Sequence, residues 1–128
     1  QRLSRGLGDV YKRQINDRTF ACKGNTKDFI WFSYKDFFRQ NLAISDFLAI
    51  CEKYNWFFID DFEQNDDYGK DIIRRFIGFI DIAYIEKVKI KFFFNSDDIR
   101  SLYIGEELSF LWDRTISRLE EMQNINDK

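Results

Sequence analysis

Apolar and polar residues follow recognisable periods along most of this chain, and the most informative stretch is the apolar run Trp56–Ile59. Two carboxylates, Asp60 and Asp61, follow it directly. Four consecutive apolar residues are too few for a buried helix, so the run predicts a strand that is buried on both faces of a sheet. The remainder of the chain is interpreted as layers around this strand.

Two further β-favouring runs, residues 19–22 and 29–32, precede the central strand. The polar stretch between them contains Gly24 and Asn25, which suit a tight turn. We therefore predict a hairpin that covers residues 15–33 and forms an edge of the sheet.

Capping residues indicate where the first helices begin. Ser33 is followed three residues later by Asp36, a partial capping box that predicts a short helix. Ser45 suits the N-cap of a second helix over residues 46–55, where apolar residues recur at helical spacing.

The apolar pattern in the second half of the chain predicts a helix, then a strand, then a second helix. From Lys70 the apolar residues fall on one helical face as far as Tyr84. Residues 87–92 alternate between lysine and apolar side chains, which predicts a strand with one solvent-exposed face. Asn95 is a possible N-cap for the last helical region, and an apolar stripe runs from Leu108 to Met122.

A helix between consecutive strands favours parallel, right-handed crossovers, and the opening hairpin adds an antiparallel edge. We expect the α/β class, with mixed α+β as the open alternative. The predicted architecture is a single domain with a mixed four-stranded sheet, an N-terminal hairpin and amphipathic helices packed on the sheet.

Residues 1–14 differ from the remainder of the chain, because they show no helical or strand period. Residues 4–14 resemble translated sequencing-adapter sequence at the ends of reading frames assembled from environmental DNA. We therefore expect a non-native, disordered segment over 1–14 and one globular domain over 15–128, with the natural N-terminus missing. A piece of a larger protein is an open alternative.

The amino-acid composition argues against several kinds of catalytic and binding site in this chain. The 128 residues include no His, and the formal net charge is −2. The commonest general base and zinc ligand is thus absent, and no overall charge favours nucleic acid or an anionic membrane. Cys22 and Cys51 lie in apolar patterns, which indicates buried thiols and a cytoplasmic location. No apolar run reaches the length of about 18 residues that a membrane span needs.

The densest group of candidate binding residues follows the central strand. It contains five carboxylates within eight residues and a neighbouring aromatic: Asp60, Asp61, Glu63, Asp66, Asp67 and Tyr68. Tyr is frequent at binding hot spots, and carboxylates attract a basic surface. This acidic loop therefore predicts a binding face for another protein, with a basic protein as one candidate.

The same loop allows a second interpretation, as a divalent-metal site. Asp60 and Asp61 would lie beyond the carboxyl end of a strand and could bind Mg²⁺ or Mn²⁺. Lys89 and Lys91, on one face of a strand, could then contact phosphate. Lysines on an exposed strand also serve to discourage edge-to-edge pairing, which is the simpler interpretation.

No catalytic set emerges from the sequence, which lacks a Gly-x-Ser-x-Gly motif and a Gly-rich phosphate-binding loop. We therefore expect a small acidic cytoplasmic protein-binding domain with no cofactor and no enzymatic activity, and an inhibitor-like or immunity-like role is one form that this function could take. The alternative is a metal-dependent enzyme or phosphate-handling domain that uses Asp60 and Asp61.

Overall fold

The computed structural model describes residues 11–15, 18–92 and 99–126. In chain order the elements are β1 (Tyr11–Ile15), β2 (Arg18–Cys22), β3 (Gly24–Asn25), β4 (Phe29–Ser33), α1 (Tyr34–Phe37), α2 (Ile44–Lys53), β5 (Trp56–Asp60), the 3₁₀ helix η1 (Asp67–Gly69), α3 (Lys70–Glu86), β6 (Lys89–Phe92), the 3₁₀ helix η2 (Ile99–Leu102) and α4 (Ser109–Asn126).

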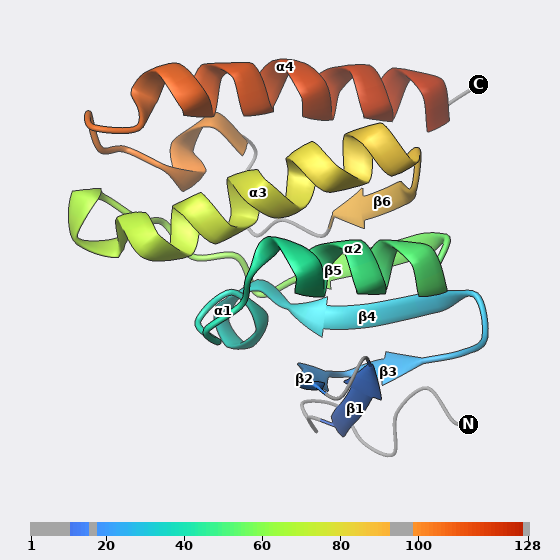
Figure 1. Cartoon of the computed structure of the whole chain (residues 1–128). Helices are drawn as coiled ribbons and strands as arrows, with labels where there is room; N and C mark the ends of the chain where they lie inside the picture. The colour runs from blue at the N-terminus through green and yellow to red at the C-terminus, as the bar shows by residue number, and fades with distance from the viewer. Residues whose placement is uncertain (1–10, 16–17, 93–98, 127–128) are drawn as a thin grey trace.

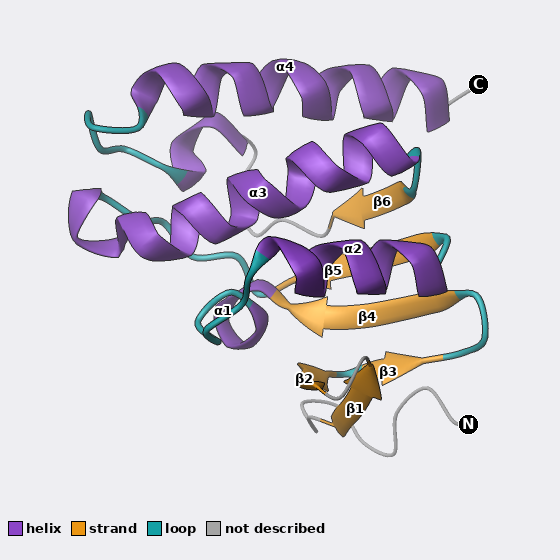
Figure 2. Cartoon of the chain, in the orientation of Figure 1, coloured by secondary structure: helices purple, strands orange, loops and turns teal. Residues whose placement is uncertain are grey.

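The main sheet has four strands in the order β3-β4-β5-β6 (Figures 1 and 2). β3 pairs with β4 in antiparallel fashion, while β4, β5 and β6 are parallel to one another. The parallel pairs follow from the helices that connect them, because a parallel crossover needs a long connection. The predicted single domain with a mixed four-stranded sheet and helices packed on it is confirmed, in its α+β form.

Helices α2, α3 and α4 are stacked on one side of the sheet (Figure 1). Strand residues that face them are fully buried, including Ile30, Phe57 and Ile59 at 0% exposure. The apolar stripe predicted for the last helix is also buried, since Trp112, Leu119 and Met122 lie in the core. These helices and the sheet thus enclose one continuous apolar core.

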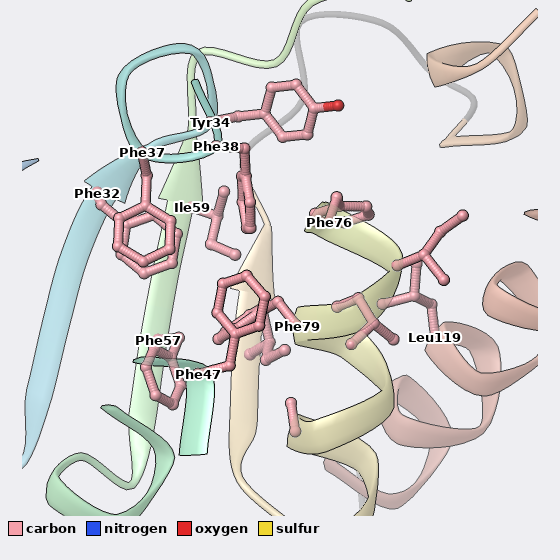
Figure 3. Close-up of a cluster of buried hydrophobic side chains, with 14 of the residues drawn as sticks. Phe32, Tyr34, Phe37, Phe38, Phe47, Phe57, Ile59, Phe76, Phe79 and Leu119 are labelled. Atoms are coloured by element: carbon pink, nitrogen blue, oxygen red, sulfur yellow. The ribbon is translucent and has the colours of Figure 1, made fainter. Parts of the chain in front are cut away.

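Aromatic rings fill that core, as Figure 3 shows for the side chains between β4, β5 and α3. Phe79 of α3 lies 5.3 Å from Phe57 and 5.9 Å from Phe32, measured between ring centroids. It also lies 5.8 Å from the rings of Phe38 and Phe47. The interplanar angles are steep, which is the arrangement that aromatic quadrupoles favour.

The prediction that β5 is buried on both faces was wrong. Only alternate residues, Phe57 and Ile59, are buried, while Trp56 and Phe58 are half-buried on the other face. Phe58 packs there against Phe29 of β4, at 4.7 Å between ring centroids. A continuous apolar run arises here because aromatic side chains of adjacent strands cover one another, without a second layer of described helices.

The opening hairpin also differs from the prediction. β2 pairs with β1, and the expected turn residues Gly24 and Asn25 form the short strand β3. The turn falls after them: the Thr26 amide donates to the Phe29 carbonyl at 2.9 Å, and the Asp28 amide donates to the Thr26 hydroxyl at 3.3 Å. A threonine hydroxyl can stabilise a turn in place of glycine.

The first of the two helix caps is confirmed, because the Ser33 hydroxyl accepts a hydrogen bond from the Asp36 amide. The second is wrong, since α2 begins after Ala43 instead of Ser45. The carboxylate of Asp46 satisfies the Ala43 amide at 2.8 Å, so the stabilising side chain lies inside the first turn. The proposed cap Asn95 lies outside the described residues.

Residues Tyr11–Gln14, assigned above to the adapter-like segment, belong to β1. The domain boundary proposed at residue 15 stays a prediction. Within the described residues, no helix has the length and apolar character that would allow it to cross a bilayer.

Candidate functional site

The candidate site lies at the carboxyl end of β5, where Asp60 ends the strand and Asp61 turns the chain. Asp61 has a φ of 54°, in the left-handed region that non-glycine residues seldom adopt. Ser33, at the end of the neighbouring strand β4, is in register with Asp60. Parallel pairing therefore brings the ends of both strands to one edge, as expected for a site in such a sheet.

A lysine that the sequence analysis missed lies between the two carboxylates. The ammonium group of Lys23 is 2.9 Å from a carboxylate oxygen of Asp60 and 2.9 Å from one of Asp61. The same ammonium is 5.3 Å from the ring centroid of Trp31. The Lys23 and Asp60 side chains are 13% and 19% exposed, whereas Asp61 is 46% exposed. We call these three charged residues the lysine–carboxylate cluster.

The cluster shifts the protonation equilibria of its members. Burial alone would lower the pKa of Lys23, but hydrogen bonds and charge attraction from Asp61 and Asp60 outweigh it and raise that pKa. The hydrogen bond from Lys23 holds the pKa of Asp61 below its ordinary value, against the opposing effect of burial. Both groups are therefore held in their charged forms.

One acceptor of the cluster is not used within the described part of the chain. Oδ1 of Asp60 is buried and has no hydrogen-bond partner there. A buried polar atom without a partner costs about 1–3 kcal/mol. The ion pair between Lys23 and the other oxygen, Oδ2, offsets this cost and stabilises the largely enclosed Asp60.

Glu63 is also held by a basic side chain. The Arg39 guanidinium donates from Nη2 to both carboxylate oxygens, at 2.5 Å and 2.7 Å. Behind it, the buried Tyr34 hydroxyl donates to the side-chain oxygen of Asn65 at 3.0 Å. Burial raises the pKa of Tyr34, and the nearby Glu63 raises it further.

Asp66 and Asp67 serve the local backbone. Asp66 accepts from the Tyr68 amide at 2.9 Å and caps η1. Asp67 accepts from the Tyr103 hydroxyl and from the amides of Glu106 and Glu107, at 3.0 Å and 3.2 Å. The hydrogen bond from Tyr103 holds the pKa of Asp67 below its ordinary value.

The acidic loop is therefore not a continuous carboxylate surface. Each of its five carboxylates contacts a cation or a backbone amide of this chain, as described above. Tyr68 is fully exposed, as suits a binding residue, whereas Tyr103, which donates to Asp67, is buried. Within the described residues, no three His, Cys, Asp or Glu side chains form a set that could hold a metal ion.

The two phosphate-contact candidates lie apart from the carboxylates. Lys89 is in register with Trp56, at the opposite end of β5 from Asp60, and its ammonium is 5.3 Å from the Trp56 ring centroid. Lys91 is in register with Phe58. The structure thus does not bring Lys89 together with Asp60 and Asp61 at one site.

The residues that complete these contacts were not predicted, because each comes from a distant part of the sequence. Lys23 lies 37 residues before Asp60, and Tyr103 lies 36 residues after Asp67. The signal that could have been noticed is the position of Lys23 directly before Gly24 and Asn25, because this part of the chain pairs beside β4.

Two hollows lie elsewhere on the molecule. One of about 520 Å³ lies between α3 and α4, lined by residues that include Ala83, Val88 and Met122. Another of about 480 Å³ lies at the opposite end of the sheet, beside Trp56 and Lys89. Neither is lined by a residue of the acidic loop, although the phosphate-contact candidate Lys89 lines the second.

Taken together, the geometry defines a small α+β domain whose charged strand end is closed by its own side chains. A family model described as AFG1-like ATPase matches residues 9–127 of the chain. The chain therefore belongs to the AFG1-like ATPase family.

A curated relative in Schizosaccharomyces pombe, uncharacterized protein C115.02c, is 32% identical over 54 residues. The aligned stretch covers 42% of this chain and 12%, about an eighth, of the relative's length. No solved structure matches the chain.

The family membership corrects the function expected from the sequence. A small inhibitor-like or immunity-like binding domain is wrong, because the match is to an ATPase family along nearly the whole chain. The physical reason for the error is clear from the contacts. The carboxylates that suggested a charged binding face instead form contacts within this chain, such as the ion pairs of Asp60 with Lys23 and of Glu63 with Arg39.

Proposed function

We propose that this chain is a segment of an AFG1-like ATPase that supports ATP hydrolysis, while another part of the ATPase holds the phosphates of ATP. The observation that carries the proposal is the family match over residues 9–127. The sequence supports this division, because it contains no G-x-x-x-x-G-K-[ST] loop. Gly69-Lys70 lacks both the earlier glycine and the following hydroxyl residue.

The end of β5 does not favour a nucleotide-bound metal in this chain. In P-loop ATPases an aspartate after an apolar strand helps to hold Mg²⁺. Here Lys23 lies 2.9 Å from each carboxylate, and a Mg²⁺ ion, which retains several waters, would have to displace its ammonium group. We assign the lysine–carboxylate cluster the role of attaching the loop around Lys23 to the end of β5.

An ATP hydrolysis assay tests the proposal. Phosphate release is measured for this chain, for the separately produced ATP-binding part of an AFG1-like ATPase, and for the two together. We expect no turnover by this chain alone and at least a severalfold rise when it is added to the ATP-binding part. An equal concentration of serum albumin is the control. An unchanged rate with both proteins folded would overturn the proposal.

We also propose that the protein works in a reducing compartment such as the cytoplasm. Cys22 and Cys51 are both buried thiols, and burial raises the pKa of Cys51 to about 12. A protonated, enclosed thiol reacts slowly, which suits a structural cysteine in a reduced protein. Thiol alkylation followed by mass spectrometry checks this: native protein should leave Cys51 unmodified, and denatured protein should take up label at both cysteines.

A further inference from the structure

The side of the main sheet that faces away from α2, α3 and α4 carries aromatic and lysine side chains (Figure 1). Successive side chains of a strand point to opposite faces, and residues paired in register share a face. Ile30, Phe57 and Ile59 are buried beneath the helices. The other face is therefore formed by two rows that cross β4, β5 and β6: Phe29, Trp56 and Lys89, and Trp31, Phe58 and Lys91. We call these six residues the aromatic–lysine face.

Contacts between the side chains show that the aromatic–lysine face is one surface. The ring centroids of Phe29 and Phe58 are 4.7 Å apart, and those of Trp56 and Phe58 are 6.3 Å apart. The ammonium group of Lys89 lies 5.3 Å from the ring centroid of Trp56. Each row thus places its rings on β4 and β5 and its ammonium group on β6.

The aromatic–lysine face remains in contact with solvent. Its four aromatic side chains are half-buried and both of its lysines are exposed, and no described helix covers it. Lysines alone would be explained by protection of β6, the outermost described strand, against edge-to-edge pairing. That role does not require large rings beside them, and a partly exposed apolar patch of this kind is typical of a binding surface.

The charge on the aromatic–lysine face is positive, although the net charge of the chain is −2. Lys89 and Lys91 provide it at the β6 edge. Asp60 follows Trp56 and Phe58 on the same face of β5, but its carboxylate is paired with the Lys23 ammonium at 2.9 Å. The local charge therefore favours an anionic ligand beside the rings.

The hollow of about 480 Å³ opens at one end of this face, beside Trp56 and Lys89. Its volume lies within the range of about 300–1,000 Å³ that is usual for small-molecule sites. Asn55 and the carboxylates of Asp28 and Glu86 also line it. These side chains offer hydrogen-bond acceptors, which suit the amino and ring N–H groups of a nucleobase.

We propose that the aromatic–lysine face binds single-stranded nucleic acid. Unpaired bases stack on aromatic rings whatever their sequence, while lysines contact the phosphates. Aromatic rings on an open sheet bind RNA in this way in other protein domains. A duplex keeps its bases stacked on one another, and an acidic peptide offers carboxylates without bases, so each would use the lysines alone. The inference goes beyond the proposed function and does not depend on it.

Fluorescence anisotropy of labelled oligothymidine and oligouridine, titrated with the whole chain at low salt, tests the proposal. We expect dissociation constants of about 1–100 μM. Phe58→Leu keeps an apolar side chain but removes the ring, and should weaken binding at least about fivefold. Lys91→Gln should weaken binding and lower the slope of log affinity against log salt by about 0.7.

Arg74→Gln is the matched control for Lys91→Gln, because it removes the same charge from an exposed position of α3, on the other side of the sheet. This control should bind as the unaltered chain does. Thermal unfolding shows that each variant is folded. Lys91 and Arg74 are both exposed, so this pair tests the face even where Phe58→Leu is unstable.

Three outcomes would overturn the inference. The first is the absence of binding to either oligonucleotide by the folded chain at low salt. The second is equal weakening by Lys91→Gln and Arg74→Gln, which would show that only the net charge matters. The third is equally tight binding of polyglutamate, lost in Lys91→Gln but kept in Phe58→Leu, which would assign the face to an acidic protein. Tighter binding of oligouridine than of oligothymidine would support the inference and indicate contacts to the 2′-hydroxyl groups.

Discussion

Lys23 is the residue that stabilises the charged end of β5. Replacing it with methionine leaves Asp60 and Asp61 close together, and Asp60 is largely enclosed. We expect Lys23→Met to destabilise the fold at neutral pH by about 2 kcal/mol, between the values for exposed and buried ion pairs. Urea denaturation measures this. A midpoint equal to that of the unaltered chain would show that solvent already compensates both carboxylates.

The same cluster predicts a pH dependence with a definite sign. The pKa of Asp61 is lowered in the folded state, so its contribution is present above the unfolded value of 3.8 and is lost as the pH falls through the lower folded value. The pKa of Lys23 is raised, so its contribution is present below 10.5 and is lost as the pH rises through the folded value. The stability difference between the unaltered chain and Lys23→Met should therefore be largest near neutral pH. Denaturation midpoints at pH 7 and pH 2.5 check this, and an equal difference at both would contradict it.

Two residues show why single positions were hard to predict. The carboxylate of Asp46, in the first turn of α2, accepts from the Ala43 amide, whereas Ser45 as an N-cap would have accepted from an amide further into the helix. Different residues can satisfy different amides at a helix start, so composition near that start does not identify the capping atom. The role of Lys23 was missed for another reason: its partners, Asp60 and Asp61, lie far from it in the sequence.

At the scale of elements, the end of α3 carries strain that a substitution can relieve. Lys87 follows the helix with φ 59° and ψ 33°, in the left-handed region. Glycine adopts that conformation without steric cost, so Lys87→Gly should stabilise the fold by about 1 kcal/mol. Glu86→Gly, one residue earlier and still in the helix, should instead destabilise it by about 1 kcal/mol. Thermal unfolding of both variants tests the pair, and equal effects would refute the argument.

Packing between α3 and the sheet depends on Phe79. Its ring is fully buried and contacts aromatic rings from β4, β5 and α2. Phe79→Ala should leave a cavity and destabilise the fold by about 3–5 kcal/mol. The control Ile85→Ala, at an exposed position of the same helix, should change stability by no more than about 0.5 kcal/mol. Urea denaturation measures both, and a cost for Phe79→Ala as small as that of the control would mean that the sheet moves in to fill the space.

The element types were predictable where the apolar period was long, as in α3 and α4, because a helix buries one face over several turns. Short aromatic runs gave less information. The run in β5 suggested cover on both faces, whereas Trp56 and Phe58 are half-buried largely through neighbouring strands. Cross-strand packing produces the same apolar pattern as a second layer, so the number of layers could not be inferred from β5 alone.

At the scale of the whole molecule, the function predicted from the sequence was wrong because it depended on what the acidic residues contact. Their density was visible in the sequence and suggested a binding face, but density does not reveal partners. These carboxylates form ion pairs with Lys23 and Arg39 and accept a hydrogen bond from the Glu106 amide, all within this chain. Large apolar side chains that remain exposed include Tyr68, Ile104 and Phe110. Of these, the sequence analysis had singled out Tyr68 alone.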